Sequence, residues 1–219
     1  MPRVQPYHHV NLRKTLLDAA VALIGEVGPR AFTLREVARR ASVSHNAPYR
    51  HFPSKDELLA AVAEEGFERL TAVMRKAMAP GRSPLERLEL GGCGYVDFAL
   101  RWPQHFLVMF DLPHARPDHP DCPDTPDAQA AGETAFHVLL DCVAAAQQSG
   151  DLAPGDLMPL AWTAWSLVHG IAKLANSGNL PLSHRATIEF TRRASQAMCG
   201  VTPAAKLPAP PAAPQKMRK

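Results

Sequence analysis

The sequence has few of the features that mark membrane and secreted proteins. None of its uncharged stretches reaches the roughly 20 apolar residues that a membrane-spanning helix requires. Its first residues, Met-Pro-Arg-Val, lack the apolar segment of a secretory signal, so we expect a cytoplasmic protein. Only four of the 219 residues are cysteine and none forms a C-x-x-C pair, which excludes a disulfide scaffold and predicts reduced thiols.

Strand patterns and the common catalytic motifs are also missing. The sequence has no Gly-x-Ser-x-Gly, Gly-x-x-x-x-Gly-Lys, His-Glu-x-x-His or dinucleotide-binding motif. The run Gly91–Gly94 lies within a helical pattern rather than after a strand, so it does not indicate a phosphate-binding loop. We therefore expect an all-α protein that is not an enzyme and needs no cofactor.

Charge is present but unevenly distributed. Residues 1–60 hold nine Lys and Arg against five Asp and Glu, a net charge of +4. Residues 61–202 hold 11 against 16, a net charge of −5, and residues 203–219 hold four basic residues and no acid. A basic head is typical of a protein that binds a polyanion, although many solvated surfaces carry as much charge.

Apolar residues at helical spacing predict three helices in and around this head. The first spans about residues 9–27 and ends at a Gly-Pro pair. The tetrapeptide Thr-Leu-Arg-Glu at 33–36 is a capping-box pattern, which opens a short helix ending near Ala41. A second capping-box pattern, Ser-Lys-Asp-Glu at 54–57, opens a longer helix that ends at Ala-Pro-Gly 79–81.

Between these helices, residues 44–51 read Ser-His-Asn-Ala-Pro-Tyr-Arg-His. With Ser44 as N-cap, Pro48 falls at the edge of a first turn, where its missing N–H costs little, so we expect a short helix over residues 45–51. At 1.5 Å per residue this helix would be about 10 Å long, which suits a B-DNA major groove about 12 Å wide. Together with the preceding short helix and a tight turn at 42–44, it has the layout of a helix-turn-helix motif.

Three stretches carry a family resemblance: Phe-Thr-Leu-Arg-Glu-Val-Ala-Arg-Arg-Ala at 32–41, Val-Ser at 43–44, and Tyr-Arg-His-Phe-Pro-Ser-Lys-Asp-Glu-Leu-Leu at 49–59. Over about residues 9 to 60 the chain resembles the DNA-binding head of the TetR/AcrR transcriptional regulators. It departs from the family at Ser42, where glycine is usual, and at His-Asn-Ala-Pro 45–48, where Lys-Gly-Thr-Leu is commoner. The second departure means that the resemblance says nothing about the operator sequence.

Two kinds of DNA contact are expected in this head. Tyr49, His51 and Lys55 carry donors that suit phosphate oxygens, and Lys55 lies in the first turn of a helix, where backbone N–H groups favour an anion. His45 and Asn46 are the expected base readers, because Asn can pair with adenine and His can donate to guanine. The resemblance adds a phosphate contact at the start of the 34–41 helix. The predicted DNA-binding residues are Thr33, Ser44, His45, Asn46, Tyr49, His51 and Lys55.

The role of Arg50 is left open. Its place in the 45–51 segment allows it to face DNA or to turn inward to acids of the flanking helices. Without the motif, all of these side chains would be interpreted as the polar surface of an ordinary helical domain.

Five further helices are expected in the body, near residues 84–101, 103–111, 125–149, 156–176 and 184–199. The run Ala-Trp-Thr-Ala-Trp-Ser-Leu-Val-His-Gly-Ile-Ala-Lys-Leu at 161–174 resembles the Trp-His-Gly helix of one C-terminal ligand-binding subfamily. The chain is thus predicted to contain a DNA-binding head over 1–54, a connecting helix over 55–82, an effector-binding and dimerisation domain over 83–202, and a disordered Pro/Ala/Lys tail over 203–219.

The helix near 156–176 is apolar on nearly every side, with Lys173 as its only charge after Asp156. Such a helix must be covered by its own domain and by a partner, and the resemblance implies a homodimer through the last two helices. We expect its small face in the dimer seam and its aromatic face in the interior. The small face comprises Ala161, Ala164 and Ala175, and the aromatic face comprises Trp162, Trp165 and His169.

Aromatic residues and methionines in the body could form the apolar wall of a small-molecule site. Plain core packing is the alternative for each of them, and a satisfied buried histidine is the alternative for His169. The resemblance implies a pocket, for which we expect an apolar or aromatic effector with one polar group. The predicted effector-binding residues are Phe98, Trp102, Phe106, Met109, Phe110, Trp162, Trp165 and His169, within a wider wall that includes Tyr95, Phe136 and Leu140.

A metal site is the alternative interpretation of residues 105–122. This stretch has no recognised ligand spacing, and its prolines indicate a surface connection, so we expect a solvated acidic loop without a metal. Its possible ligands are His105, Asp111, His114, Asp118, His119, Asp121 and Cys122. The resemblance implies instead a repressor that binds palindromic double-stranded operator DNA as a homodimer and is released by a small-molecule effector. A metal-responsive regulator remains the alternative.

Overall fold

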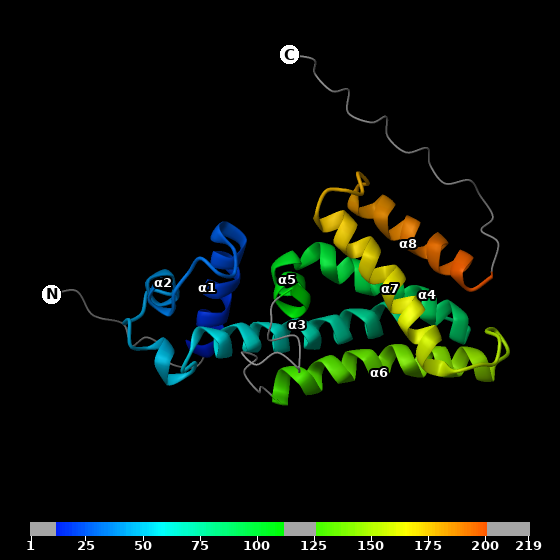
Figure 1. The fold of residues 1–219 in the computed structure, drawn as a ribbon, viewed down its shortest axis with the longest axis horizontal. Helices are drawn as coiled ribbons and strands as arrows, with labels where there is room; N and C mark the ends of the chain where they lie inside the picture. Colours follow the sequence, from blue (N-terminus) through cyan, green and yellow to red (C-terminus); the bar gives the residue numbers. More distant parts are fainter. Residues whose placement is uncertain (1–11, 112–125, 201–219) are drawn as a thin grey trace, which may run out of the picture. The chain divides into compact units, whose positions relative to one another are not determined.

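The computed structural model describes residues 12–111 and 126–200, and within these ranges it contains helices and no strand (Figure 1). The all-α prediction is therefore confirmed for the described residues. The elements are α1 (Leu12–Val27), α2 (Leu34–Arg40), the 3-10 helix η2 (Pro48–Arg50), α3 (Lys55–Met78), α4 (Pro84–Arg101), α5 (Pro103–Asp111), α6 (Pro126–Gln148), α7 (Leu157–Asn176) and α8 (His184–Met198). The five body helices lie within one residue of their predicted bounds at either end.

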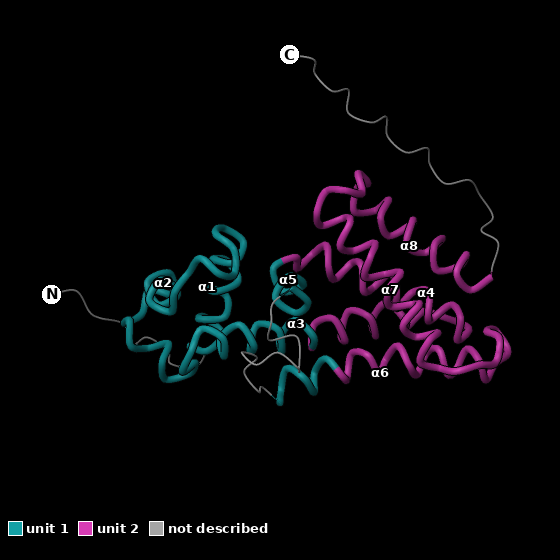
Figure 2. Tube along the Cα trace, in the orientation of Figure 1, with its two compact units in different colours: residues 1–67, 104–132 teal, residues 68–103, 133–219 magenta. Residues whose placement is uncertain are grey.

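The chain forms two compact units (Figure 2). Unit 1 comprises residues 1–67 and 104–132, and unit 2 comprises residues 68–103 and 133–219. The predicted boundaries after residues 54 and 82 were drawn by function rather than by compactness, and they remain a prediction. The predicted tail, 203–219, lies outside the described residues.

In unit 1, α1 packs against α2, and α2 packs against η2. The apolar stripe of α1 is buried, and it ends where the Gly-Pro pair predicted, with the Gly28 amide donating to the Ile24 carbonyl at 3.0 Å. The side chains buried in this small core include Leu16, Leu23, Val37, Leu58 and Val62. Burial of each such side chain contributes about 1.5–3 kcal/mol to folding.

In unit 2, α4, α7 and α8 pack side by side (Figure 1). The glycine-rich run lies within α4, as predicted, and it allows close helix approach on two sides. A Cβ on Gly94 would stand 2.9 Å from the Ala77 Cβ of α3, and a Cβ on Gly92 would stand 3.1 Å from a methyl of Val168 in α7. These glycines therefore serve packing and not phosphate binding.

The buried face of α8 is made of hydroxyl side chains: Thr187, Thr191 and Ser195. Thr187 Oγ1 donates to the Ser183 carbonyl at 3.0 Å, and Thr191 Oγ1 donates to the Thr187 carbonyl at 2.8 Å. Because both threonine hydroxyls bond to carbonyls within α8 or its N-cap, these two side chains can be buried without a hydrogen-bond partner from α4.

The predicted orientation of α7 is wrong. Ala161 and Ala164, which we expected in a dimer seam, are buried within the single chain, together with Val168 and Ala172. Trp162, expected in the interior, is 53% exposed. Small side chains let α7 approach α4 closely, so the small face became the inner face of this helix.

Candidate DNA-binding surface and buried aromatic cluster

The first helix of the predicted motif is fixed by the predicted capping box. Thr33 Oγ1 accepts from the Glu36 amide at 3.3 Å, and Glu36 Oε2 accepts from the Thr33 amide at 2.7 Å and from its hydroxyl at 2.9 Å. The hydrogen bond from the Thr33 side chain is the largest cause that lowers the pKa of Glu36. The Thr33 hydroxyl, a predicted phosphate contact, is thus already used to begin α2.

The turn that follows α2 explains why glycine is usual at position 42. Ser42 has a φ of 56°, in the left-handed region, and Ala41 is the C-cap of α2. The Ser42 amide donates to the Arg39 carbonyl at 3.2 Å, and the Val43 amide donates to the Ala38 carbonyl at 3.0 Å. These two bonds form a Schellman motif, whose left-handed position favours glycine because it has no Cβ.

The predicted α-helix over residues 45–51 is wrong. Only Pro48–Arg50 is helical, and it is a single turn of 3-10 helix. An α-helix with Ser44 as N-cap would need its first hydrogen bond from the amide of residue 48 to the Ser44 carbonyl, and proline has no such amide. The Ser44 carbonyl accepts instead from the Ala47 amide at 2.9 Å. The missing N–H of Pro48 therefore matters more than predicted, because the segment forms a 3-10 turn and not an α-helix.

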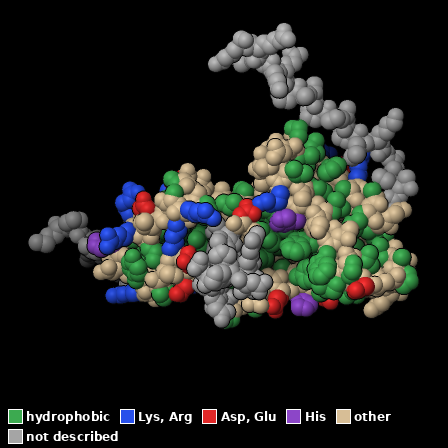
Figure 3. Space-filling view, in the orientation of Figure 1, with side chains coloured by type: hydrophobic (Ala, Val, Ile, Leu, Met, Phe, Trp, Pro, Cys, Tyr) green, Lys and Arg blue, Asp and Glu red, His purple; other side chains and the backbone are tan. Residues whose placement is uncertain are grey.

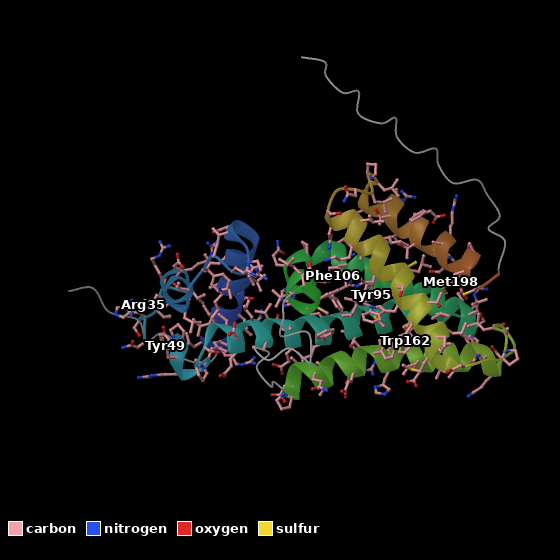
Figure 4. The ribbon with its side chains drawn as sticks, viewed as in Figure 1. Arg35, Tyr49, Tyr95, Phe106, Trp162 and Met198 are labelled. Atoms are coloured by element: carbon pink, nitrogen blue, oxygen red, sulfur yellow. The ribbon has the colours of Figure 1, made fainter. Side chains whose placement is uncertain are left out.

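The predicted base-reading and phosphate-binding side chains lie together on the outside of this segment. Ser44, His45, Asn46, Tyr49 and His51 are all exposed. Figure 4 labels Tyr49 in this segment. Tyr49 is 48% exposed. The roles of these residues in DNA binding remain predictions.

Arg50 does not have the structural role that we left open for it. The side chain is exposed and forms no ion pair with a described residue. It therefore adds a positive charge to the surface formed by residues 44–51.

Lys55 is held in place within unit 1. Its Nζ donates to the Arg30 carbonyl at 2.9 Å and lies 4.5 Å from the centroid of the Phe32 ring. Partial burial lowers the pKa of the Lys55 ammonium, while Asp56 and Glu36 oppose that shift. This ammonium uses only one of its three N–H donors on Arg30, so it can still bind a phosphate oxygen.

Two arginines of α2 belong to the same surface, and they were not among the DNA-binding residues predicted from the sequence. Arg35 and Arg39 are exposed, and neither forms an ion pair with a described residue. In contrast, Arg40 is paired with Glu26 at 2.7 Å. The signal was available in the sequence, because Arg35 and Arg39 lie one helical turn apart. Figure 3 shows Lys and Arg side chains gathered over unit 1 on the face in view, and Figure 4 labels Arg35.

The predicted effector-binding residues are divided between the two units. Phe106, Met109 and Phe110 belong to α5 of unit 1, where Phe110 packs on Phe106 and on Phe67 at ring-centroid distances of 5.1 and 5.6 Å. Phe106 and Met109 are fully buried in this cluster. In unit 1 these aromatic side chains thus have the packing of a core.

The unit 2 members are Phe98, Trp102, Trp162, Trp165 and His169. Phe98 is completely buried against Trp102, with ring centroids 5.6 Å apart. Trp165 lies 5.9 Å from His169 and 6.0 Å from Phe136, between ring centroids. The structure therefore brings Trp165 and His169 together, whereas Trp162 lies on the exposed side of α7.

Tyr95 links Trp165 and His169. The Trp165 Nε1–H donates to the Tyr95 oxygen at 3.2 Å, and the Tyr95 oxygen lies 2.8 Å from His169 Nδ1. An indole can only donate, so the Tyr95 oxygen is the acceptor from Trp165, while the direction of the Tyr95–His169 bond depends on the tautomer of the imidazole. Burial raises the pKa of Tyr95, so it stays a neutral phenol. Tyr95 was in the wider predicted wall but not among the predicted effector-binding residues.

Most of the metal alternative lies outside the described residues. Only His105 and Asp111 of its seven possible ligands are described. Among residues 12–111 and 126–200, no group of three or more His, Cys, Asp or Glu could hold a metal ion. Cys93, Cys142 and Cys199 are free thiols, as predicted, and Cys122 lies outside these ranges.

Comparison with known families explains this combination of head and body. Residues 16–62 match the bacterial regulatory proteins of the tetR family, and residues 88–198 match the tetracyclin repressor-like C-terminal domain. The chain belongs to the TetR family. The second match covers more than half of the chain and includes Tyr95, Trp165 and His169.

Curated relatives match this TetR-family chain over about a third of its length. The HTH-type transcriptional repressor KstR of Rhodococcus jostii is 45% identical over 78 residues, which are 36% of this chain and 36% of that protein. The HTH-type transcriptional regulator BetI of Rhizobium meliloti is 38% identical over 76 residues, covering 35% of this chain and 37% of BetI. The matched region thus spans about a third of the length of these relatives.

Solved structures resemble the chain over most of its length. A protein with unknown function from Rhodococcus sp. RHA1 is 33% identical, covers 91% of this chain and 100% of its own, and has a TM-score of 0.78. The transcriptional regulator FadR from Bacillus subtilis, solved in complex with stearoyl-CoA, shares the fold with a TM-score of 0.72 at 14% identity, over 87% of this chain and 99% of its own. In the described parts of the present chain, no helix combines the length and apolarity needed to cross a bilayer.

Proposed function

We propose that this TetR-family protein is a transcriptional repressor that binds double-stranded operator DNA through unit 1. The observation that carries the proposal is the cluster of exposed side chains after the Ser42 turn, with Asn46 and Tyr49 at its centre. Hydrogen-bonding side chains in this place of a helix-turn-helix layout suit base edges and phosphates. Arg35 and Arg39 of α2, which form no ion pair within residues 12–111 and 126–200, add positive charge beside them. Within this proposal, residues 1–54 act as the DNA-binding head and 55–82 as its connecting helix.

The proposed repressor acts as a homodimer, and the exposed face of α7 supports this. Trp162 and Leu174 are 53% and 49% exposed. Between them lie exposed Ser166 and half-buried Gly170, and a Cβ added to Gly170 would meet no atom within 4 Å. A face with small residues between two large apolar ones suits close contact with the same face of a second copy. A dimer of this kind would place two heads on the two halves of a palindromic operator.

A single charge on this face tests the dimer. Trp162→Glu should give a folded monomer by light scattering, because a carboxylate in the seam would be desolvated without a partner. Val27→Glu is the matched control, since Val27 in unit 1 is 52% exposed and large, and this variant should remain dimeric. A dimeric Trp162→Glu protein would place the seam elsewhere.

We propose that a small apolar or aromatic effector releases the repressor from DNA. Support comes from the Tyr95–Trp165–His169 cluster in unit 2, which combines aromatic surface with hydrogen-bonding groups, and Trp165 and His169 are only partly buried. An effector that binds better to the dimer geometry with wrongly spaced heads would lower operator affinity by its difference in affinity for the two states. The roles of Phe98, Trp102 and the α5 aromatics in this site remain predictions.

Selection of duplexes from a random DNA pool tests DNA binding directly. The wild-type protein should enrich one palindromic sequence, and Asn46→Ala should lose preference at one base pair per half-site, at a cost of about 1–3 kcal/mol. Asn179→Ala, an exposed asparagine in the body, should select the wild-type sequence. Failure of the wild-type protein to enrich any sequence would reject the proposed function.

A further inference from the structure

The segment between the Ser42 turn and α3 has a hydrogen-bond pattern that differs from an α-helix. The amides of Ala47, Arg50 and His51 each donate to a carbonyl three residues earlier, at 2.9, 3.3 and 2.9 Å. Only the Phe52 amide donates four residues back, to the Pro48 carbonyl at 2.8 Å. The proposed reading segment, residues 44–51, thus contains three-residue turns and one turn of 3-10 helix at Pro48–Arg50 in place of an α-helix.

Pro48 disfavours α-helical winding at this point, and its ring is buried. It cannot supply the amide hydrogen that would close the first α-helical turn on the Ser44 carbonyl. Its side chain is buried at less than 2% exposure, so it is not available to contact DNA. The neighbouring side chains Asn46 and Tyr49 are exposed and are positioned by the backbone that Pro48 imposes.

The difference in winding is large enough to change which bases are reached. A 3-10 helix rises about 2.0 Å per residue and an α-helix about 1.5 Å. Over the three residues Pro48–Arg50 the two geometries differ by about 1.5 Å, close to half the spacing of about 3.4 Å between successive bases of a strand. The number of residues per turn also changes, from about 3.6 to 3.0, so side chains rotate relative to the groove.

We propose that Pro48 is a specificity-determining residue that acts through the backbone: it holds the reading segment in a 3-10 turn, and this sets which bases Asn46 and its neighbours meet. The inference rests on the proposed DNA binding by unit 1. It predicts that the operator preference changes when position 48 regains an amide, although no DNA-facing side chain has been altered. Pro48 is thus a positioning residue and not a DNA contact.

The test combines a structural and a sequence readout on the full-length chain. In Pro48→Ala, Cα chemical shifts of residues 45–51 should move to α-helical values, and selection from a random duplex pool should enrich a sequence that differs from the wild-type one at one or more positions in each half-site. The salt dependence of binding to random DNA should stay within experimental error of the wild type, because no charge has changed. Pro48→Leu, which refills the buried volume, should give the same new preference as Pro48→Ala.

Pro53→Ala is the matched control. Pro53 is exposed and lies beyond the last hydrogen bond of the segment, so this variant should select the wild-type sequence. The proposal is overturned if Pro48→Ala or Pro48→Leu becomes α-helical and still selects the wild-type sequence, or if both keep the 3-10 turn. Unfolding of both variants would also overturn it, because the ring would then be needed for packing. If the wild-type protein itself selects nothing, the proposed function fails instead.

Discussion

The reading segment of unit 1 and the aromatic cluster of unit 2 organise their side chains in opposite ways. Asn46 and Tyr49 lie within a few residues of each other, face solvent, and are positioned by backbone hydrogen bonds of a short segment. Tyr95 and His169 are 74 residues apart, come from two helices, and are positioned by bonding to each other inside the unit. The first arrangement leaves polar groups available to a partner, whereas the second satisfies them internally.

This difference predicts where substitutions are costly. Polar side chains of the reading segment can be removed with little loss of stability, because water satisfies their neighbours. Removing a polar atom from the cluster leaves partly buried groups without that partner, which costs free energy of folding. Substitutions in the reading segment of unit 1 should therefore change DNA binding without changing stability. Substitutions in the cluster of unit 2 should lower stability.

The largest effect should come from a charge on the inner face of α7. Ala164 is 6% exposed, so Ala164→Glu would bury a carboxylate without a partner and should cost more than about 4 kcal/mol, enough to unfold unit 2. Thermal unfolding followed by circular dichroism measures this loss. Ala153→Glu, at an exposed loop position, should melt within a few degrees of the wild type. A folded monomeric Ala164→Glu protein would instead support our original placement of this face in a dimer seam.

A smaller loss is expected when one hydroxyl is removed from the cluster. Tyr95→Phe leaves Trp165 Nε1 and His169 Nδ1 without the oxygen they bond, and should lower the free energy of unfolding by about 1–3 kcal/mol. Tyr49→Phe makes the same chemical change at an exposed site and should alter stability by less than about 0.5 kcal/mol. Urea denaturation of both variants gives the comparison. Equal losses of unfolding free energy would show that removing a hydroxyl costs no more in the cluster than at the surface.

Lys55 tests whether one side chain can both stabilise its unit and bind DNA. Lys55→Ala removes the bond to the Arg30 carbonyl and the contact with the Phe32 ring, so stability should fall by about 0.5–1 kcal/mol. If Lys55 also binds phosphate, the slope of log affinity against log salt should decrease by about one for specific and random DNA alike. Lys76→Ala, at an exposed position near the other end of α3, should change neither quantity. An unchanged salt slope in Lys55→Ala would make Lys55 a purely structural residue.

The smallest effect should be a gain. Ser42→Gly relieves a left-handed backbone at φ 56° and should stabilise unit 1 by up to about 1 kcal/mol. Ser177→Gly is the control, because Ser177 ends α7 at φ −83°, where glycine relieves nothing. The midpoints of thermal unfolding of the two variants, compared with the wild type, measure these effects. A loss in both variants would mean that chain entropy outweighs the backbone strain at Ser42.

Local sequence signals predicted most helix boundaries. They failed at Pro48, where the rule that a first-turn proline is tolerated was applied one residue too far into the helix. The capping box at Thr33 and the Gly-Pro stop after α1 are confirmed, because both depend on residues within one turn. Pro48 was placed where its missing amide should not matter, yet with Ser44 as N-cap that amide is the first one an α-helix needs.

The sequence by itself determined the all-helical fold, the family and the residues that form the reading segment, since all of these rest on local patterns. Only the tertiary structure decided which face of α7 is buried. This helix is apolar nearly all round, so its periodicity does not distinguish an inner from an outer face. Its small residues face inward because they allow the closest packing against α4. The same packing brought Tyr95 to His169, a contact between distant positions that no local pattern encodes.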